Sequence, residues 1–226
     1  MSLRLSGGRR LLSPPGSGAR PTAARVRLAV MNLLAADIPG CRWLDLCSGS
    51  GVMACEALQR GASEVVAVER DRRIAAVARA NLELIQAGMT EGTAEGSTLA
   101  ETMSGPRVML VADDVMRWLN RDAGLGKRRR PGNGVTGTNR DFDLIYADPP
   151  YRGNLYEGIA EGVSRGGWLR PGGTMVWECS SSDPPSVPQG WRLIDERRYG
   201  GTGLILLEAT LDFQGRQDGD IEAGCR

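Results

Sequence analysis

The stretch from Phe142 to Tyr151 limits the possible folds more than any other part of the chain. Its apolar run is typical of a buried strand. The run ends at Asp148, where Pro149 and Pro150 exclude both a helix and further strand pairing. Ligands of open α/β sheets bind at the carboxyl ends of strands. The Asp148 carboxylate, the Pro149 carbonyl and the Tyr151 ring therefore predict a site for a flat molecule with an NH2 group, although these residues could also form a simple turn after a strand.

The rest of the chain alternates apolar strand-like and helix-like segments. The pattern predicts further strands at 41–47, 64–69, 107–113, 173–179, 192–199 and 203–207, and helices at 52–60, 71–87, 115–119 and about 154–168. An earlier helix follows Arg20, with Arg25 and Arg27 off its apolar face. These elements predict an α/β fold: a seven-stranded, mostly parallel sheet with an antiparallel strand at its edge and helices on both faces.

The length of 226 residues fits one domain with short extensions. We place this domain at 21–210, after a basic arm at 1–20 and before an acidic tail at 211–226 that we expect to be disordered. Residues 6–20 contain so much glycine and proline that we expect an extended, irregular arm. Two segments rich in glycine and polar residues, at about 88–106 and 121–140, are predicted to be surface insertions.

Several functional classes are excluded by composition. The chain has no histidine, which excludes histidine-dependent nucleophilic triads and most catalytic metal sites. The cysteines form no CxxC pair, which argues against a zinc site and a secreted disulfide framework. The apolar runs are far shorter than the ~20 residues that a membrane helix needs. We therefore expect a metal-free, cytoplasmic protein whose chemistry depends on carboxylates, backbone groups and a cofactor.

The segment from Gly49 to Ala54 has the G-x-G-x-x-A form of a cofactor-binding turn between a strand and a helix. Glu69 ends the next strand, at the position from which a carboxylate binds ribose hydroxyls. Asp45 precedes the turn, and an acid there repels a pyrophosphate but attracts a cationic amino group. The pattern therefore favours S-adenosylmethionine over NAD.

Basic residues are concentrated in two places although the formal net charge is only +1. The first 36 residues contain six arginines and no acid, and residues 127–130 form a second basic block. Such patches on a nearly neutral chain indicate a polyanionic partner. An arginine-rich, acid-poor N-terminus is also typical of organelle transit peptides, and that alternative stays open.

Taken together, the motifs of this sequence resemble those of the class I, Rossmann-like amino-methyltransferases. The resemblance is carried by Leu44–Gly51, Glu69, Asp114-Val115 and Asp148-Pro149-Pro150-Tyr151. The chain is more closely similar to the RsmD-type family of bacterial 16S rRNA guanine-N2 methyltransferases, through Gly7–Arg10, Arg20–Arg27 and the ending Tyr199-Gly200-x-Thr202. The similarity runs from about residue 6 to 208. The two insertions are longer than we expect for that family.

The resemblance implies a role for each matching position. The cofactor would lie against Asp45, Cys47, Gly49, Ser50, Gly51, Glu69, Arg70, Asp114 and Val115, with Glu69 at the ribose and Asp114, rather than the adjacent Asp113, at the adenine amine. The target base would lie against Asp148, Pro149, Pro150 and Tyr151. RNA would contact Arg9, Arg10, Arg20, Arg25 and Arg27.

The function that follows is methylation of a guanine N2 amine in small-subunit rRNA, free or in an assembling particle, by a monomer that needs no metal and no membrane. Because a stacked or paired base cannot reach such a site, its nucleotide would be flipped out. Two alternatives remain. One is an amino-methyltransferase that acts on DNA adenine or a protein glutamine, and the other is a non-catalytic RNA-binding protein of the same fold.

Overall fold

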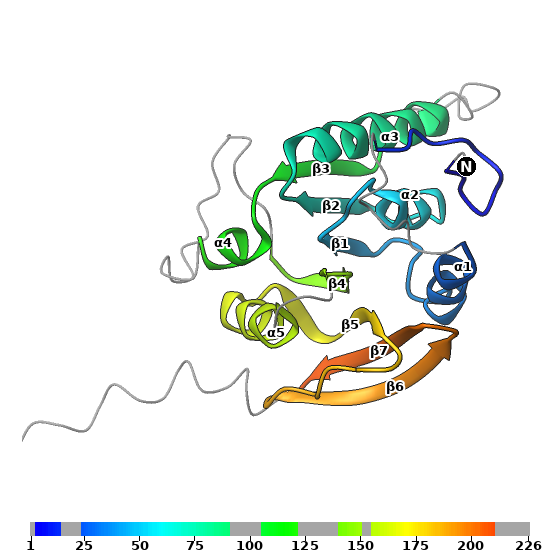
Figure 1. Ribbon diagram of the computed structural model, residues 1–226. Helices are drawn as coiled ribbons and strands as arrows, with labels where there is room; N and C mark the ends of the chain where they lie inside the picture. Colours follow the sequence, from blue (N-terminus) through cyan, green and yellow to red (C-terminus); the bar gives the residue numbers. More distant parts are fainter. Residues whose placement is uncertain (1–2, 15–23, 91–104, 122–139, 151–154, 211–226) are drawn as a thin grey trace, which may run out of the picture.

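The computed structural model describes residues 3–14, 24–90, 105–121, 140–150 and 155–210. Helices and strands alternate as predicted until the last three strands, which follow one another (Figure 1). In chain order the elements are α1 (Ala24–Leu33), β1 (Arg42–Leu46), α2 (Val52–Gln59), β2 (Glu64–Glu69), α3 (Arg72–Thr90), β3 (Arg107–Ala112), α4 (Val115–Asn120), β4 (Phe142–Ala147), α5 (Leu155–Gly166), β5 (Leu169–Ser180), β6 (Trp191–Tyr199) and β7 (Thr202–Ala209).

All seven strands form one sheet in the order β3-β2-β1-β4-β5-β7-β6. The first five are parallel, and β7 is antiparallel to both of its neighbours. The predicted mixed sheet is confirmed, but the antiparallel strand is not at the edge. The six residues Thr202–Leu207 are buried, so β7 needs a neighbour on each side, whereas the charged strand β6 can face water at the edge.

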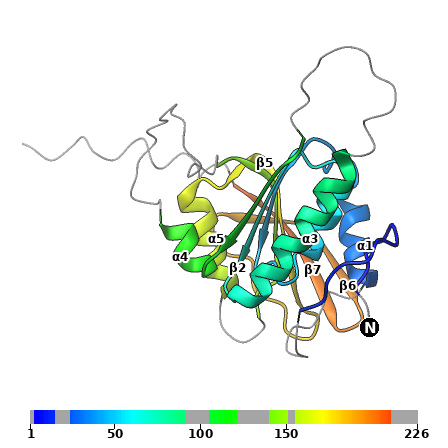
Figure 2. The same cartoon turned by 90° about the horizontal axis from the view of Figure 1, so that it is seen from above.

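Two layers of helices cover the sheet. Helices α1, α2 and α3 lie on one face, and α4 and α5 lie on the other (Figures 1 and 2). Successive side chains of a strand point to opposite faces. In β1, Leu44 and Leu46 pack toward α4 and α5, while Trp43 packs toward α1 and α2. By this alternation Asp45 faces α2, as does Tyr146 of β4, whose ring stacks against Trp43.

The beginning of the chain corrects the prediction of an irregular arm. A backbone bridge joins Arg4 to Arg10, and Leu3, Leu5 and Leu11 are buried in the core layer of α1 and α2. The N–H of Leu11 donates to the carbonyl of Leu3 at 2.9 Å. The glycine-rich sequence obscured this compact turn, which the three leucines hold against the domain. Residues 15–20 lie outside the described part of the chain.

Arg27 is a second correction. It was predicted to lie off the buried face of its helix, but only 5% of it is exposed. Its guanidinium donates to the carbonyl of Arg4 at 2.5 Å and lies 3.7 Å from the buried carboxylate of Glu56. Glu56 also accepts bonds from the backbone N–H and hydroxyl of Ser6 at 2.8 and 2.7 Å. An ion pair inside the fold therefore explains why a charged side chain sits on the apolar side of α1.

The first predicted insertion begins later than expected, because residues 88–90 still belong to α3. Residues 91–104 and 122–139 of the two insertions, with the basic block at 127–130, fall outside the described ranges, as does the acidic tail. No helix among the described residues is long and apolar enough to cross a membrane.

Candidate active site

The glycine turn connects β1 to α2 at the carboxyl edge of the sheet. Cys47, Gly49 and Gly51 have positive φ angles of 62°, 54° and 73°. At Gly51 a side chain would also meet the Cβ of Ala78 on α3 at 3.2 Å. Glycine is required there because both the backbone conformation and the close approach of α3 disfavour a Cβ. At Gly49, by contrast, nothing lies within 4 Å of the place of a Cβ, so the turn is open on that side.

Asp45 lies directly under this turn. It is 1% exposed, and its carboxylate accepts a bond from the N–H of Ala54 at 3.1 Å. Since the N-cap residue Gly51 has no side chain, Asp45 satisfies one of the free N–H groups of the first turn of α2. Burial raises the pKa of Asp45 well above its ordinary range, and the charges of Asp148 and Glu69 add to this effect. A cationic group of a ligand would therefore stabilise its ionised form.

Glu69 connects the end of β2 to the same turn. One carboxylate oxygen accepts from the N–H of Gly49 at 2.9 Å, and the other accepts from the N–H of Asp71 at 2.8 Å. The carboxylate is half-buried, and the neighbouring Arg70 is exposed. The position of Glu69 fits the predicted contact with ribose hydroxyls, and its bond to Gly49 also fixes the turn.

The two acids that follow β3 have different surroundings. Asp113 is buried and paired with Arg117 and Arg121. Asp114 caps α4, and one of its oxygens accepts both bonds, from the N–H groups of Met116 and Arg117 at 3.0 and 3.1 Å. Its other oxygen has no partner among the described residues. Asp114 is therefore the better acceptor for an adenine amine.

The carboxylates of the site converge on Cys47, the residue that starts the turn. Burial, together with the charges of Glu69, Asp45, Asp148 and Asp114, raises the pKa of the Cys47 thiol to about 12. The four acids come from the ends of β2, β1, β4 and β3. Side chains that are far apart in the sequence are thus brought to one edge of the sheet, as predicted. Among the described residues no group of cysteine and acidic side chains could hold a metal ion.

Asp148 follows β4, next to the end of β1. Its N–H donates to the carbonyl of Leu46 at 3.4 Å. Pro149 is buried and Pro150 is exposed, while Tyr151 falls outside the described ranges. Of the other predicted cofactor residues, Val115 is buried and Ser50 has only 9% of its surface exposed. Asp148 therefore lies beside the end of β1, from which the glycine turn starts.

Two functional details were missed by the sequence analysis. Asn81 of α3 is fully buried, and its amide donates to the carbonyls of Ser50 and Leu12 at 3.0 and 3.1 Å, while its oxygen accepts from the N–H of Leu12 at 2.8 Å. It joins the N-terminal arm to the glycine turn. Its position three residues after Ala78, on an apolar helix face, could have revealed it. Behind Asp148, the buried hydroxyl of Tyr146 donates to the carboxylate of Glu178.

The predicted RNA-contacting arginines do not form one cluster. Arg9 lies against Gly88, ten residues and about 15 Å along α3 from the contact with the glycine turn. Arg10 is exposed, and Arg27 is buried. Arg25 is exposed and lies next to Gly200, in the turn between β6 and β7. Arg20 falls outside the described residues.

Comparison with known proteins supports this description. The family model "Conserved hypothetical protein 95" matches residues 5–108 and 125–208. Ribosomal RNA small subunit methyltransferase D of Escherichia coli strain K12 is 28% identical over 94% of this chain and 90% of its own length. The enzyme of the same name from Haemophilus influenzae is 27% identical over 89% of both chains. The solved structure of "Putative methyltransferase yhhF from Escherichia coli" has a TM-score of 0.65 and 25% identity, over 92% of this chain and 98% of that one. The resemblance to RsmD-type enzymes is thus confirmed, and the chain belongs to the conserved hypothetical protein 95 family.

Proposed function

We propose that this protein transfers the methyl group of S-adenosylmethionine to the exocyclic N2 amine of a guanine in small-subunit rRNA. The observation that carries the proposal is the position of Asp148. It lies at the end of β4 and contributes to the same charge environment as Asp45 and Glu69 of the glycine turn. An acceptor for an amine would thereby lie beside a cofactor site, and the relatives are named rRNA methyltransferases.

The residues of the turn fit S-adenosylmethionine. Asp45 is a buried carboxylate whose raised pKa a cationic amino group would lower again. Glu69 is positioned for two ribose hydroxyls, and Asp114 for an adenine amine. Gly49 and Gly51 leave room for the methionine part. Cys47, Ser50, Arg70 and Val115 complete the wall of the site. When bound, the cofactor supplies a methyl group on a positively charged sulfur, which drives its transfer.

Asp148 and Pro149 would activate the target amine. The lone pair of an exocyclic guanine amine is delocalised into the ring, which makes the nitrogen a poor nucleophile. Hydrogen bonds from the NH2 group to the Asp148 carboxylate and the Pro149 carbonyl would draw the nitrogen toward tetrahedral geometry and direct its lone pair. Pro150 would fix the loop, and Tyr151 would stack on the base. Orientation supplies most of the remaining acceleration.

The RNA would be bound by exposed arginines. Arg25 lies next to Gly200, in the turn that follows β6, and Arg9, Arg10 and Arg20 would contact other phosphates. Arg27 is withdrawn from this set because it is buried in an ion pair. We propose that the protein acts as a monomer in the cytoplasm, where its substrate is either free rRNA or an assembling particle.

The experiment that tests this function maps methylated guanines in small-subunit rRNA from cells with and without the protein. The expected result is one N2-methylguanine that is lost without the protein and restored by purified protein with S-adenosylmethionine. Transfer of the methyl group to DNA adenine or to a protein glutamine instead would refute the substrate. Absence of any transfer with bound cofactor would favour a non-catalytic RNA-binding protein.

A further inference from the structure

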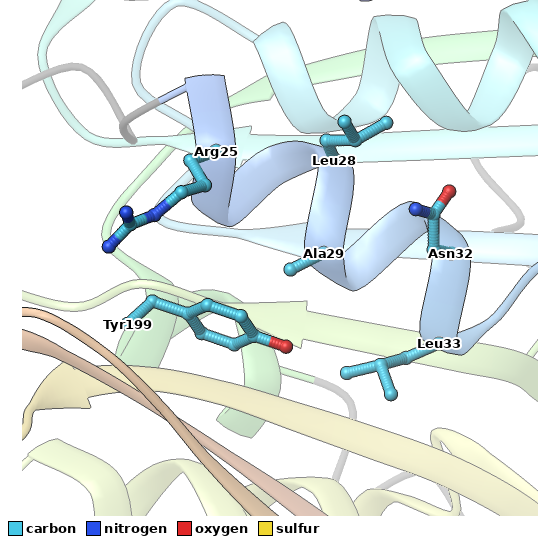
Figure 3. A pocket seen from close by; sticks show the side chains of 6 residues that line it. All are labelled: Arg25, Leu28, Ala29, Asn32, Leu33 and Tyr199. Atoms are coloured by element: carbon cyan, nitrogen blue, oxygen red, sulfur yellow. The ribbon is translucent and has the colours of Figure 1, made fainter.

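A groove beside the active site joins two sequence motifs to which no complete role has been assigned. It has a volume of about 380 Å³ and is lined by Arg25, Leu28, Ala29, Asn32, Leu33 and Tyr199 (Figure 3). Five of these residues belong to α1 and the sixth ends β6. The fold therefore combines the arginine-rich motif before residue 28 with the Tyr-Gly motif near the end of the domain, more than 170 residues away in the chain.

The polar groups of this groove have no partner inside the described part of the protein. Arg25 and Asn32 are exposed, Tyr199 is half-buried, and none of their side chains makes a hydrogen bond or ion pair with another described residue. Figure 3 shows the Tyr199 ring opposite Ala29, between the Arg25 guanidinium and Leu33. The groove thus offers an aromatic ring, apolar walls, a carboxamide and a cation. Such a combination suits a nucleotide: its base contacts the ring, and its phosphate pairs with the guanidinium.

The strand register puts this groove on the same edge of the sheet as Asp148. Strand β6 runs in the direction of β4, because β4 is parallel to β5 and the two antiparallel pairings, β5 with β7 and β7 with β6, reverse the direction twice. In the register of the sheet, Ala147 of β4 pairs with Trp177 of β5. Trp177 pairs with Ile205 of β7, which in turn pairs with Glu196 of β6. Tyr199 lies three residues beyond Glu196 and so past the level at which β4 ends. Three strand spacings, ~14 Å, separate the two positions across the sheet.

The groove also lies on the same face of the sheet as Tyr146. Tyr199, Ala29 and Leu33 pack against the same core layer as Tyr146, the residue two positions before Asp148. The cofactor turn, Asp148 and the groove therefore follow one another along one face of the carboxyl edge. An RNA strand whose guanine enters at Asp148 would pass the groove with a neighbouring nucleotide.

We propose that the groove between α1 and the end of β6 binds an unpaired nucleotide that flanks the target guanine in the rRNA. This inference rests on the proposed function and deepens it. The flipped guanine alone makes few contacts that distinguish it from other guanines. A second nucleotide held by Tyr199 and Arg25 would fix the RNA strand and contribute to the choice of target.

The test measures methyl transfer to small ribosomal subunits, and to protein-free rRNA, from cells that lack this protein. Tyr199→Leu should raise the KM for RNA by about 5- to 150-fold, as expected for loss of one base–aromatic contact. The kcat and the affinity for S-adenosylmethionine should stay unchanged. Tyr199→Phe keeps the ring and should restore most of the RNA affinity. Arg25→Ala should raise the KM and reduce its salt dependence, whereas Arg79→Ala, an exposed arginine on the outer side of α3, should have no effect.

Leu28→Glu provides a variant that does not depend on the packing of Tyr199. Leu28 is 44% exposed, so the substitution should leave the fold intact while it places a negative charge in the groove. A raised KM for RNA supports the proposal. An unchanged KM in folded Leu28→Glu and Tyr199→Leu proteins overturns it, while methylation by the wild-type protein still supports the proposed function. If the wild-type protein methylates no rRNA, the proposed function fails first.

Discussion

Glu69 offers the most direct test of the cofactor site. Its two carboxylate oxygens accept from Gly49 and Asp71, so any ribose hydroxyl would use their remaining lone pairs. Glu69→Ala removes the proposed ribose acceptor and also the bond that fixes the turn. Hydrogen bonds to a charged group contribute ~1.5–3 kcal/mol. The dissociation constant for S-adenosylmethionine should therefore rise by about 10- to 150-fold.

Isothermal titration calorimetry measures this change, and thermal unfolding shows whether the protein remains folded. Glu69→Gln keeps one oxygen for Gly49 but turns an NH2 group toward the other donor, so its affinity should fall between those of the wild type and the Ala variant. Glu83→Ala, an exposed acid on α3, is the matched control and should bind normally. Unchanged affinity in folded Glu69→Ala protein would remove Glu69 from the site. Preferential binding of NAD would refute the cofactor assignment as a whole.

Predictions for three further residues follow from the structure. Asp148→Ala should lower the rate of methyl transfer by ~10²–10³-fold, by analogy with loss of an oriented group in a water-poor site, and should leave cofactor affinity normal. Asp148→Asn should retain measurable activity. An equal loss of activity in both variants would indicate that Asp148 is a proton-accepting base. Asn81→Leu should destabilise the fold by ~1–3 kcal/mol, because the buried Ser50 carbonyl loses its donor, and should weaken cofactor binding; an unchanged melting temperature would contradict this. Asp45 has a raised pKa, so the native state binds its proton more tightly than the unfolded state, and stability should fall as pH rises from the ordinary carboxyl pKa to the raised one. Binding of S-adenosylmethionine should release this proton in the same pH range. Calorimetry in two buffers of different ionisation enthalpy detects the release, and Asp45→Asn should abolish it.

The parts of the site that follow from local sequence could be predicted. Asp148 and Glu69 end apolar strands, and the spacing of Gly49 and Gly51 belongs to one short turn, so each can be recognised without knowledge of the fold. Parallel strands then bring such ends together. The order of the elements follows from the same local periodicity.

What could not be predicted depends on contacts between distant segments. The position of Arg27 inside the fold depends on Glu56, which the helical pattern of α1 does not contain. The docking of the arm depends on three leucines among glycines and on the amide of Asn81, which lies 69 residues after Leu12. The position of β7 inside the sheet depends on which of two hairpin strands is the more apolar on both faces.

The place of β7 has a consequence for the order in which the protein matures on the ribosome. Strand β6 pairs only with β7 among the described strands, so Tyr199 cannot reach α1 until residues 202–209 have been synthesised and inserted next to β5. The glycine turn and Asp148 belong to strands that are complete much earlier. A nascent or truncated chain could therefore assemble the proposed cofactor site while the proposed nucleotide groove is still missing. The proposed groove for the flanking nucleotide would come last, with the final strand of the sheet.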